Sequence, residues 1–293
     1  MAFLSVIVLS YNQESMIERC LNSILESDTN KVELIISDDC SRDDTVKYID
    51  KWVNDNEEHF EKVIIIKNTV NIGTVRNLIN AVEVSSAEYI KVIAADDWFL
   101  PGALDVIVTH CSGETFDVAF SSLKIAYQEN DGKTNITGES LPASKIEGFF
   151  DMSSEVQYKH MTRKNCLRSP GAFFTRKFWE IIDLKNTNIK IVEDWAMWLK
   201  GVSLEQNYIE IPEIIVVYRQ TPLSVSNNAV SPTYKKYLSD NAWVIKNISL
   251  KKKEWLSVFD SIYLIILWIS IKLMLMMPLN VIARIEKIRK NKK

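Results

Sequence analysis

The sequence of 293 residues predicts an α/β domain with a doubly wound, mostly parallel sheet, followed by a helical C-terminal region. Strand and helix patterns alternate over the first hundred residues, and the strand patterns are short apolar runs rich in β-branched residues. Near the C-terminus, a long apolar stretch is followed by a basic tail. With 47% hydrophobic and 25% charged residues, the composition is that of an ordinary globular protein.

The elements are expected in a regular strand–helix order. Strands are predicted at 4–10, 32–39, 62–68 and 89–97, and helices at 15–27, 43–56 and 73–85. In the first helix, apolar residues recur at helical spacing, as at Met16, Cys20 and Ile24. Right-handed crossovers make such strands parallel. A ligand of this kind of sheet binds beyond the carboxyl ends of the strands.

Polar side chains stand at the ends of all four predicted strands or directly after them. They are Ser10, Tyr11, Asn12, Asp38, Asp39, Asn68, Asp96 and Asp97. The adjacent carboxylates of Asp96 and Asp97 repel each other, and burial increases that cost. Carboxylate oxygens suit Mg²⁺ or Mn²⁺, so a metal carrying a diphosphate is the expected positive partner. The alternative is that the two aspartates cap a helix that starts near Pro101.

The sequence motifs of several common nucleotide-binding functions are absent. Neither G-x-G-x-x-G nor G-x-x-x-x-G-K-[ST] occurs, so the charge of a phosphate would be met by a metal or by a basic side chain such as Arg76. A net charge of -3 and a pI near 5.8 give no reason to expect nucleic acid as a partner. The four cysteines are far apart in the sequence, and we expect them to be packing residues.

The C-terminal region, 226–293, is expected to be helical and to associate with a membrane through the apolar segment 261–282. Its most apolar part, 261–277, is interrupted only by Lys272 and is slightly short for a span of about 20 residues. Basic clusters stand on both sides of it. A helix in the membrane plane, or a re-entrant one, lets both clusters face one anionic leaflet, which favours it over a spanning helix. A buried helix with a solvated tail is the alternative.

Five segments together resemble a known family. In order along the chain they are SVIVLSYNQESMIERCLNSIL, ELIISDDCSRDDT, NIGTVRNLINAV, YIKVIAADDWFLPGAL and VEDWAMWLK. This order is similar to that of the family 2 glycosyltransferases of the Rossmann-like GT-A fold, and it places the catalytic domain at 1–225. The resemblance implies transfer of a sugar, with inversion, from a nucleotide-sugar that is most often UDP-linked, with Mn²⁺ or Mg²⁺ as cofactor.

The resemblance assigns residues to the nucleotide-sugar. Asp39 matches the residue that hydrogen-bonds the uracil, and Leu9, Ser10 and Tyr11 line the same base pocket. Arg76 matches a basic residue near the base and the diphosphate. Two structural alternatives remain open: a helix-capping or Asx-turn role for Asp39, and a surface salt bridge for Arg76.

The AADD segment stands where the family has its D-x-D motif. We assign Asp96 to the ribose and Asp97 to the metal, although the two roles could be exchanged. The commonest version has another acid at the position of Ala94, and its loss leaves the metal affinity in question. Thr221 stands where many relatives have a histidine, two residues after Arg219, which could meet a phosphate.

The VEDWAMWLK segment is expected to carry the catalytic base. Inversion is a single displacement, so the attacking hydroxyl needs a general base within hydrogen-bonding reach. The resemblance gives this role to Asp194, with Glu193 beside it. Because helix starts favour acidic residues, capping is the alternative. The rings of Trp195 and Trp198 could stack on a sugar, although Trp198 is better explained as core.

The resulting expectation is a glycosyltransferase at the cytoplasmic face of the inner membrane, peripheral or monotopic, with a single-pass protein as the alternative. Its acceptor would be a glycan, expected to be lipid-linked, in the synthesis of a bacterial surface polysaccharide such as O-antigen or capsule. Two other functions compete with it: a metal-dependent nucleotidyltransferase, and a nucleotide-sugar-binding subunit that has lost catalysis. Residues 121–168 show little pattern from which the sugar or the acceptor could be read.

Overall fold

The computed structural model describes residues 2–128, 134–220 and 231–290. Packing divides the chain into two compact units that interleave along the sequence. The first unit comprises 1–151, 167–185 and 206–220, and the second comprises 152–166, 186–205 and 221–293. The domain boundary expected at residue 225 lies outside the described residues, as does Thr221, and that boundary stays a prediction.

The first unit begins with the four predicted parallel strands and the three predicted helices. The strands stand side by side in the order β3-β2-β1-β4. Their bounds are β1 Leu4–Ser10, β2 Val32–Asp38, β3 Lys62–Lys67 and β4 Tyr89–Ala94, and the helices are α1 Ile17–Ile24, α2 Thr45–Asn56 and α3 Thr74–Val84. The doubly wound α/β fold is therefore confirmed.

The second half of the sheet is mixed rather than parallel. From β4 the order continues β8-β6-β9-β5, with β7 paired to β6. Among the described strands of this half, only β6 and β9 pair in parallel. The bounds are β5 Trp98–Phe99, β6 Val118–Gln128, β7 Thr134–Leu141, β8 Ala172–Thr175 and β9 Tyr208–Gln220. None of these strands was predicted from the sequence.

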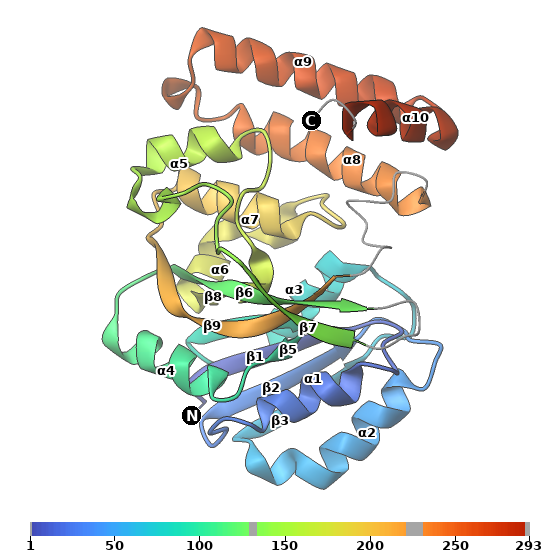
Figure 1. Cartoon of the computed structure of the whole chain (residues 1–293), viewed down its shortest axis with the longest axis vertical. Helices are drawn as coiled ribbons and strands as arrows, with labels where there is room; N and C mark the ends of the chain where they lie inside the picture. Colours follow the sequence, from blue (N-terminus) through green and yellow to red (C-terminus); the bar gives the residue numbers. More distant parts are fainter. Residues whose placement is uncertain (1, 129–133, 221–230, 291–293) are drawn as a thin grey trace. The chain divides into compact units, whose positions relative to one another are not determined.

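The order of the strands creates a switch point between β1 and β4. The chain moves outward from β1 to β3 and then crosses back to β4, so α1 and α2 cover one face of the sheet and α3 covers the other (Figure 1). At such a point the crossovers leave the sheet in opposite directions. The carboxyl ends of β1 and β4 therefore flank the crevice in which ligands of α/β sheets bind.

A buried lysine joins this part of the sheet to the mixed half. The side chain of Lys91 on β4 is fully buried, and its Nζ donates to the carbonyl oxygens of Pro170 and Ala172. Between these two residues lies Gly171, where a Cβ would stand 2.3 Å from the carbonyl oxygen of Ser121. Only glycine fits this close approach of two backbone segments.

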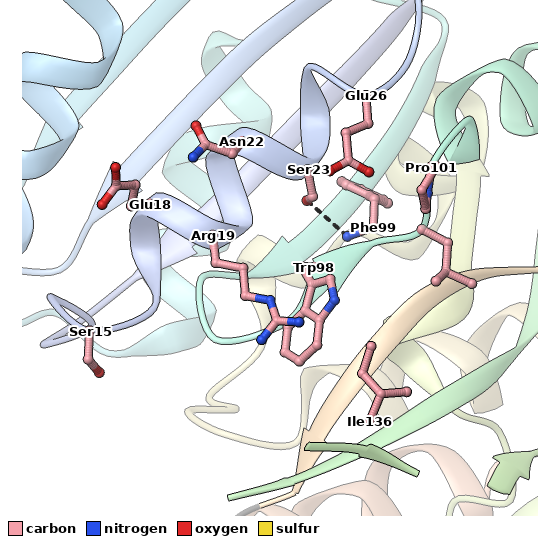
Figure 2. Close-up of a pocket in the computed structure, with 11 residues that line it drawn as sticks. Ser15, Glu18, Arg19, Asn22, Ser23, Glu26, Trp98, Phe99, Pro101 and Ile136 are labelled. Carbon is pink, nitrogen blue, oxygen red and sulfur yellow. Dashed lines mark hydrogen bonds between the residues drawn. The ribbon is translucent and has the colours of Figure 1, made fainter. Parts of the chain in front are cut away.

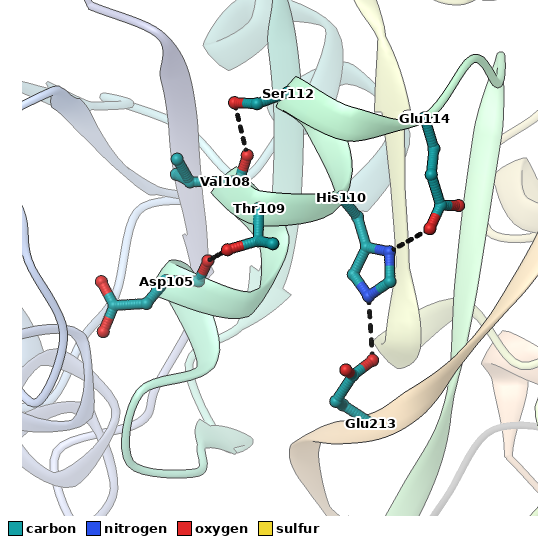
Figure 3. A network of polar contacts seen from close by, with 7 residues as sticks. All are labelled: Asp105, Val108, Thr109, His110, Ser112, Glu114 and Glu213. Atoms are coloured by element: carbon teal, nitrogen blue, oxygen red, sulfur yellow. Dashed lines mark hydrogen bonds and ion pairs between the residues drawn. The ribbon is translucent and has the colours of Figure 1, made fainter.

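An ion-pair network holds helix α4, Ala103–Gly113, to β9. Figure 3 shows the ring of His110 between two carboxylates, with Nδ1 2.8 Å from Glu114 and Nε2 2.9 Å from Glu213. Burial alone would lower the pKa of His110, but the hydrogen bonds to Glu213 and Glu114 outweigh it and raise the pKa. The network therefore favours the imidazolium form.

We expect His110→Asn to lower the free energy of unfolding by about 1 kcal/mol at pH 5.5 and by much less at pH 9. Because the folded pKa is raised, the stabilisation is complete below the unfolded pKa of about 6.5 and is lost as the pH rises through the folded value. Urea unfolding at the two pH values measures it, with His59→Asn as the control. An equal loss at both pH values would show that the charge does not stabilise the fold.

The second unit is helical in its described part. Its helices are α5 Ser154–Met161, α7 Glu193–Ser203, α8 Pro232–Val244, α9 Val258–Leu275 and α10 Leu279–Lys290. A capping box of Ser257 and Asp260 starts α9, and the apolar segment expected as one piece is divided where Pro278 precedes α10. Among the described residues, α9 is the one helix long and apolar enough to cross a membrane, by length and composition.

Candidate active site

Strand register brings the predicted nucleotide residues to one edge of the first unit. Leu9 pairs with Ala94 across β1 and β4, and Ser10 pairs with Asp38 across β1 and β2. The backbone N–H of Asp39 donates to the carbonyl oxygen of Ser10 at 2.9 Å, so the ends of the first two strands are tied together. The polar residues at these strand ends thus belong to one surface, beside the switch point.

The turn after β2 is built by Asp38 rather than by its neighbour. One oxygen of Asp38 accepts from the backbone N–H of Ser41 at 2.8 Å, and the other accepts from the hydroxyls of Ser41 and Ser10. This local bond from a side chain to the backbone spans three residues and closes the turn, with additional support from β1. The side chain of Tyr11, directly after β1, is 43% exposed at this edge.

Asp39 fixes the start of helix α3. Its two oxygens accept from the backbone N–H groups of Ile72 and Gly73, at 2.7 and 2.8 Å. Each oxygen keeps a second acceptor direction. Arg76 lies in the first turn of the same helix, is exposed, and forms no ion pair with any described residue. The salt-bridge alternative for Arg76 is therefore not what the structure shows.

The two adjacent aspartates occupy a tight turn between β4 and β5. The N–H of Asp97 donates to the carbonyl oxygen of Ala94 at 3.0 Å. The next helix, α4, has Gly102 at its N-cap and no side-chain cap, so the aspartates do not cap it. Asp97 is 3% exposed, whereas Asp96 is about a quarter exposed, with 28% of its side chain accessible.

The positive partner that the structure shows for this pair is Arg219, at the end of β9. Its backbone N–H donates to Asp97 at 2.8 Å, and its guanidinium lies 3.3 Å from Asp96. The antiparallel pairing of β5 with β9 brings Arg219 close to the two aspartates, since Trp98 stands opposite Val217. The sequence suggested Arg219 only as a phosphate ligand, because the two partners are more than a hundred residues apart.

Keeping both Asp96 and Asp97 ionised costs free energy unless further positive charge lies nearby. Burial, followed by repulsion from Asp96, raises the pKa of Asp97 well above its usual range, against the opposing effects of Arg219 and Lys91. Burial in turn lowers the pKa of Lys91 to about 7. A divalent cation would relieve the repulsion between the two carboxylates.

The donor set fits a magnesium- or manganese-type ion shared with a ligand. In the part of the chain that the structure describes, no group of three or more His, Cys, Asp and Glu side chains is arranged to hold a metal by itself. Mg²⁺ is commonly held by one or two carboxylates together with phosphate oxygens of the substrate. Asp96 and Asp97 supply such a pair.

The predicted catalytic acids open helix α7 of the second unit. Asp194 accepts from the Nδ2 of Asn165 at 2.8 Å and from the backbone N–H of Trp195 at 2.6 Å. The N-cap position is held by Val192, without a side-chain cap, so neither acid is the N-cap residue of this helix. Sequence reasoning missed Asn165, because nothing near it in the sequence indicates a contact 29 residues away.

Glu193 is the more perturbed of the two acids. Burial, followed by repulsion from Asp194, raises the pKa of Glu193 to about 8. Its Oε2 is buried and has no hydrogen-bond partner among the described residues. The neighbouring rings of Trp195 and Trp198 are both buried, so the expectation that Trp195 could stack on a sugar was wrong, whereas the core role of Trp198 is confirmed.

A groove of about 500 Å³ on the first unit contains none of the predicted site residues. Figure 2 shows that it runs between α1 and the segment from Trp98 to Pro101, with Ile136 at one side. The guanidinium of Arg19 lies 3.5 Å from the centre of the Trp98 ring and covers it. Because Trp98 is also only 5% exposed, the ring offers no free face for a sugar, and we assign the groove no role.

The matching family model and two of the similar proteins describe glycosyltransferases. The model of the family described as "Glycosyl transferase family 2" matches residues 5–179. The chain is 26% identical to a GalNAc(5)-diNAcBac-PP-undecaprenol beta-1,3-glucosyltransferase of Campylobacter jejuni, over 80% of this chain and 71% of that protein. It is 24% identical to the UDP-Glc:alpha-D-GlcNAc-diphosphoundecaprenol beta-1,3-glucosyltransferase WfaP of Escherichia coli, over 86% and 88%. An uncharacterized protein of Mycobacterium tuberculosis is matched over 36% of its length.

Solved structures agree on the fold. S. aureus TarS, in complex with UDP-GlcNAc, superimposes with a TM-score of 0.59 at 19% identity, over 86% of this chain and 69% of that one. The mannosyltransferase PcManGT of Pyrobaculum calidifontis, in complex with GDP-Man and Mn²⁺, gives a TM-score of 0.56 at 14% identity, over 92% and 80%. The two neighbours carry different nucleotides, so the fold does not select the base.

Proposed function

The chain is a member of the family 2 glycosyltransferases, and we propose that it transfers a sugar from a UDP-sugar to a hydroxyl of a lipid-linked glycan, with inversion and with a divalent metal. The observation that carries this proposal is the adjacent pair Asp96 and Asp97 in a turn at the switch point of the sheet, beside the ends of β1 and β2. Relatives named for undecaprenol-linked glycans support the class of acceptor.

The nucleotide would bind at the ends of β1 and β2. The carboxylate of Asp39 is held by two backbone N–H groups and keeps acceptor directions for the N–H of a uracil. The backbone of Leu9 and Ser10, and the exposed Tyr11, would form the walls of the base pocket. Arg76, with no protein partner in the described chain, would meet the diphosphate.

The metal would lie at the aspartate pair, and its chemistry would be to neutralise the charge of the leaving diphosphate. Mn²⁺ and Mg²⁺ both suit carboxylate oxygens. Both aspartates contact Arg219, but Asp96 is the more exposed of the two, which favours Asp96 as the direct ligand. This exchanges the roles first assigned to the two residues.

Asp194 would act as the general base. Inversion needs a hydroxyl that attacks from the face opposite the nucleotide and gives up its proton as it attacks. A carboxylate oriented by Asn165 can accept that proton. Glu193, whose pKa burial raises to about 8 and whose Oε2 has no partner among the described residues, is the competing candidate.

The protein would work at the cytoplasmic face of the inner membrane, in the assembly of a surface polysaccharide. Helix α9 and its C-cap residue Met276 leave large apolar side chains exposed; those on the helix are Val258, Phe259, Ile262, Ile265, Ile266, Ile269 and Leu273. Its buried residues, Leu264, Ile271 and Met274, lie on one stripe, and α8 runs beside it (Figure 1). Charged residues on α8, such as Lys235 and Lys236, do not suit the hydrocarbon core, so α9 would lie in the membrane plane.

We expect the double substitution Phe259→Glu and Ile266→Glu to weaken binding to phosphatidylglycerol-containing vesicles about tenfold or more, because it places charge on the apolar face. Vesicle flotation measures the binding, and Val84→Glu, on α3, is the control. The wild type should be released by alkaline carbonate. Retention after carbonate would instead indicate a spanning helix, and equal binding by the double variant would exclude this face.

Calorimetric titration with UDP, GDP and dTDP, each with and without Mn²⁺, tests the proposed function. UDP binding that strengthens with the metal is the expected result, followed by hydrolysis or transfer when UDP-sugars are supplied. Absence of nucleotide binding under every condition would overturn the proposal. Preference for GDP would keep the enzyme class and change the donor.

A further inference from the structure

Helix α7, which begins with the two candidate catalytic acids, has no cap of its own. Val192 occupies the N-cap position and has no side chain that can accept a hydrogen bond. The N–H groups at a helix start have no acceptor within the helix, so they need another partner. In most helices a local Ser, Thr, Asp or Asn provides it.

Here the acceptor for the segment entering the helix comes from another helix. Asp240, on α8, is 2% exposed, and its Oδ2 accepts from three successive backbone N–H groups. The distances are 2.8 Å to Lys190, 2.7 Å to Ile191 and 3.3 Å to Val192. A single carboxylate oxygen therefore fixes the three residues that lead directly into Glu193.

Because Asp240 takes the N–H groups of 190–192, neither acid of α7 has to accept them. Since Asp240 holds the entering backbone, Asp194 can point to Asn165. The Oε2 of Glu193 stays buried without a partner among the described residues. Burying a third carboxylate nearby costs free energy. The three hydrogen bonds that Oδ2 of Asp240 accepts from backbone N–H groups offset that cost, because hydrogen bonds to a charged acceptor are stronger than neutral ones.

We propose that Asp240 is a positioning residue for the catalytic base. It fixes the backbone before Glu193 and thereby the direction in which Asp194 projects, and its negative charge acts on Glu193. This inference rests on the proposed role of Asp194 in the transferase reaction.

The charges around these acids determine the direction of the effect. Asp194 and, more weakly, Asp240 contribute to the raised pKa of Glu193, and Lys190 is the cation that faces Asp240. Removing the charge of Asp240 should lower the pKa values of nearby carboxyl groups. The acid limb of the pH profile of kcat should then move to lower pH, which a purely structural contact would not cause.

Asp240→Asn is the informative variant, because it keeps the size of the side chain and one acceptor oxygen while removing the charge. We expect kcat to fall on the order of 10- to 100-fold through misplacement of the base, with KM for the UDP-sugar unchanged and the acid limb at lower pH. Hydrogen exchange of the amides at 190–192 should become faster. Deleting α9 is a poorer test, since α9 packs against α8.

The matched control is Ser231→Ala, which removes the hydroxyl that caps the other end of the same helix. It should leave the pH profile and the exchange at 190–192 as in the wild type. A wild-type kcat and pH profile in Asp240→Asn would overturn the inference, as would a loss of kcat that Ser231→Ala reproduces at equal loss of melting temperature. Failure of the proposed function is distinguishable, because the wild type itself would then transfer no sugar.

Discussion

Replacing Asp194 with asparagine should lower kcat for sugar transfer by about 10²- to 10⁴-fold, the usual contribution of a general base, while UDP affinity stays unchanged. The amide retains the shape of the side chain and can still accept from Asn165, but it cannot take the proton of the acceptor hydroxyl. Initial rates of transfer from a UDP-sugar to a lipid-linked acceptor measure kcat, and calorimetry measures the binding of UDP.

Glu193→Gln provides the comparison within the same helix turn. If Asp194 is the base, the glutamine variant should keep most of the activity and change mainly the pH profile, because it removes a group whose pKa is near 8. A larger loss in Glu193→Gln than in Asp194→Asn would reverse the two roles. Unchanged behaviour of both variants would favour a nucleotide-sugar-binding subunit without catalysis.

Replacing Asp96 or Asp97 with alanine should abolish the gain in UDP affinity that Mn²⁺ provides. The two carboxylates are the acidic ligands available at this turn, and a divalent ion between them and the diphosphate supplies attraction that neither Arg76 nor Arg219 replaces. We expect UDP affinity with Mn²⁺ to fall at least about tenfold, and affinity without metal to change little. Asp96→Ala should have the greater effect if exposure decides which carboxylate binds the ion directly.

The same titrations on Asp50→Ala serve as a control, because Asp50 is an exposed carboxylate of α2 paired with Lys67. Its variant should respond to Mn²⁺ as the wild type does. Thermal melting separates loss of metal from loss of fold, which matters for the buried Asp97. A full response to Mn²⁺ in both aspartate variants would place the metal elsewhere or remove it from the mechanism.

Local sequence patterns were sufficient to predict the first half of the sheet, strands β1 to β4. The strands β1 to β4 are apolar runs because they are covered by helices on both faces, and the helices between them show apolar residues at helical spacing. Since parallel strands end at the same edge, the polar residues after them could be placed together without a structure. The family followed from five such segments in order.

The mixed half of the sheet could not be predicted in this way. Strands β6, β8 and β9 pair across long stretches of chain, and their register depends on partners that a local pattern does not reveal. The close approach at Gly171 and the buried Lys91 follow from this pairing. Their positions in the sequence carry no signal of it.

The sequence by itself determined the α/β class, the edge of the sheet at which the acidic residues gather, the family, and the apolar character of the C-terminal helix. The tertiary structure decided which groups meet: Arg219 with the aspartate pair, Asn165 with Asp194, and Asp240 with the backbone before Glu193. It also decided which face of α9 packs and which is exposed. The physical reason is that apolar periodicity is a local property, whereas the burial and hydrogen bonding of a charged side chain depend on residues distant in the chain.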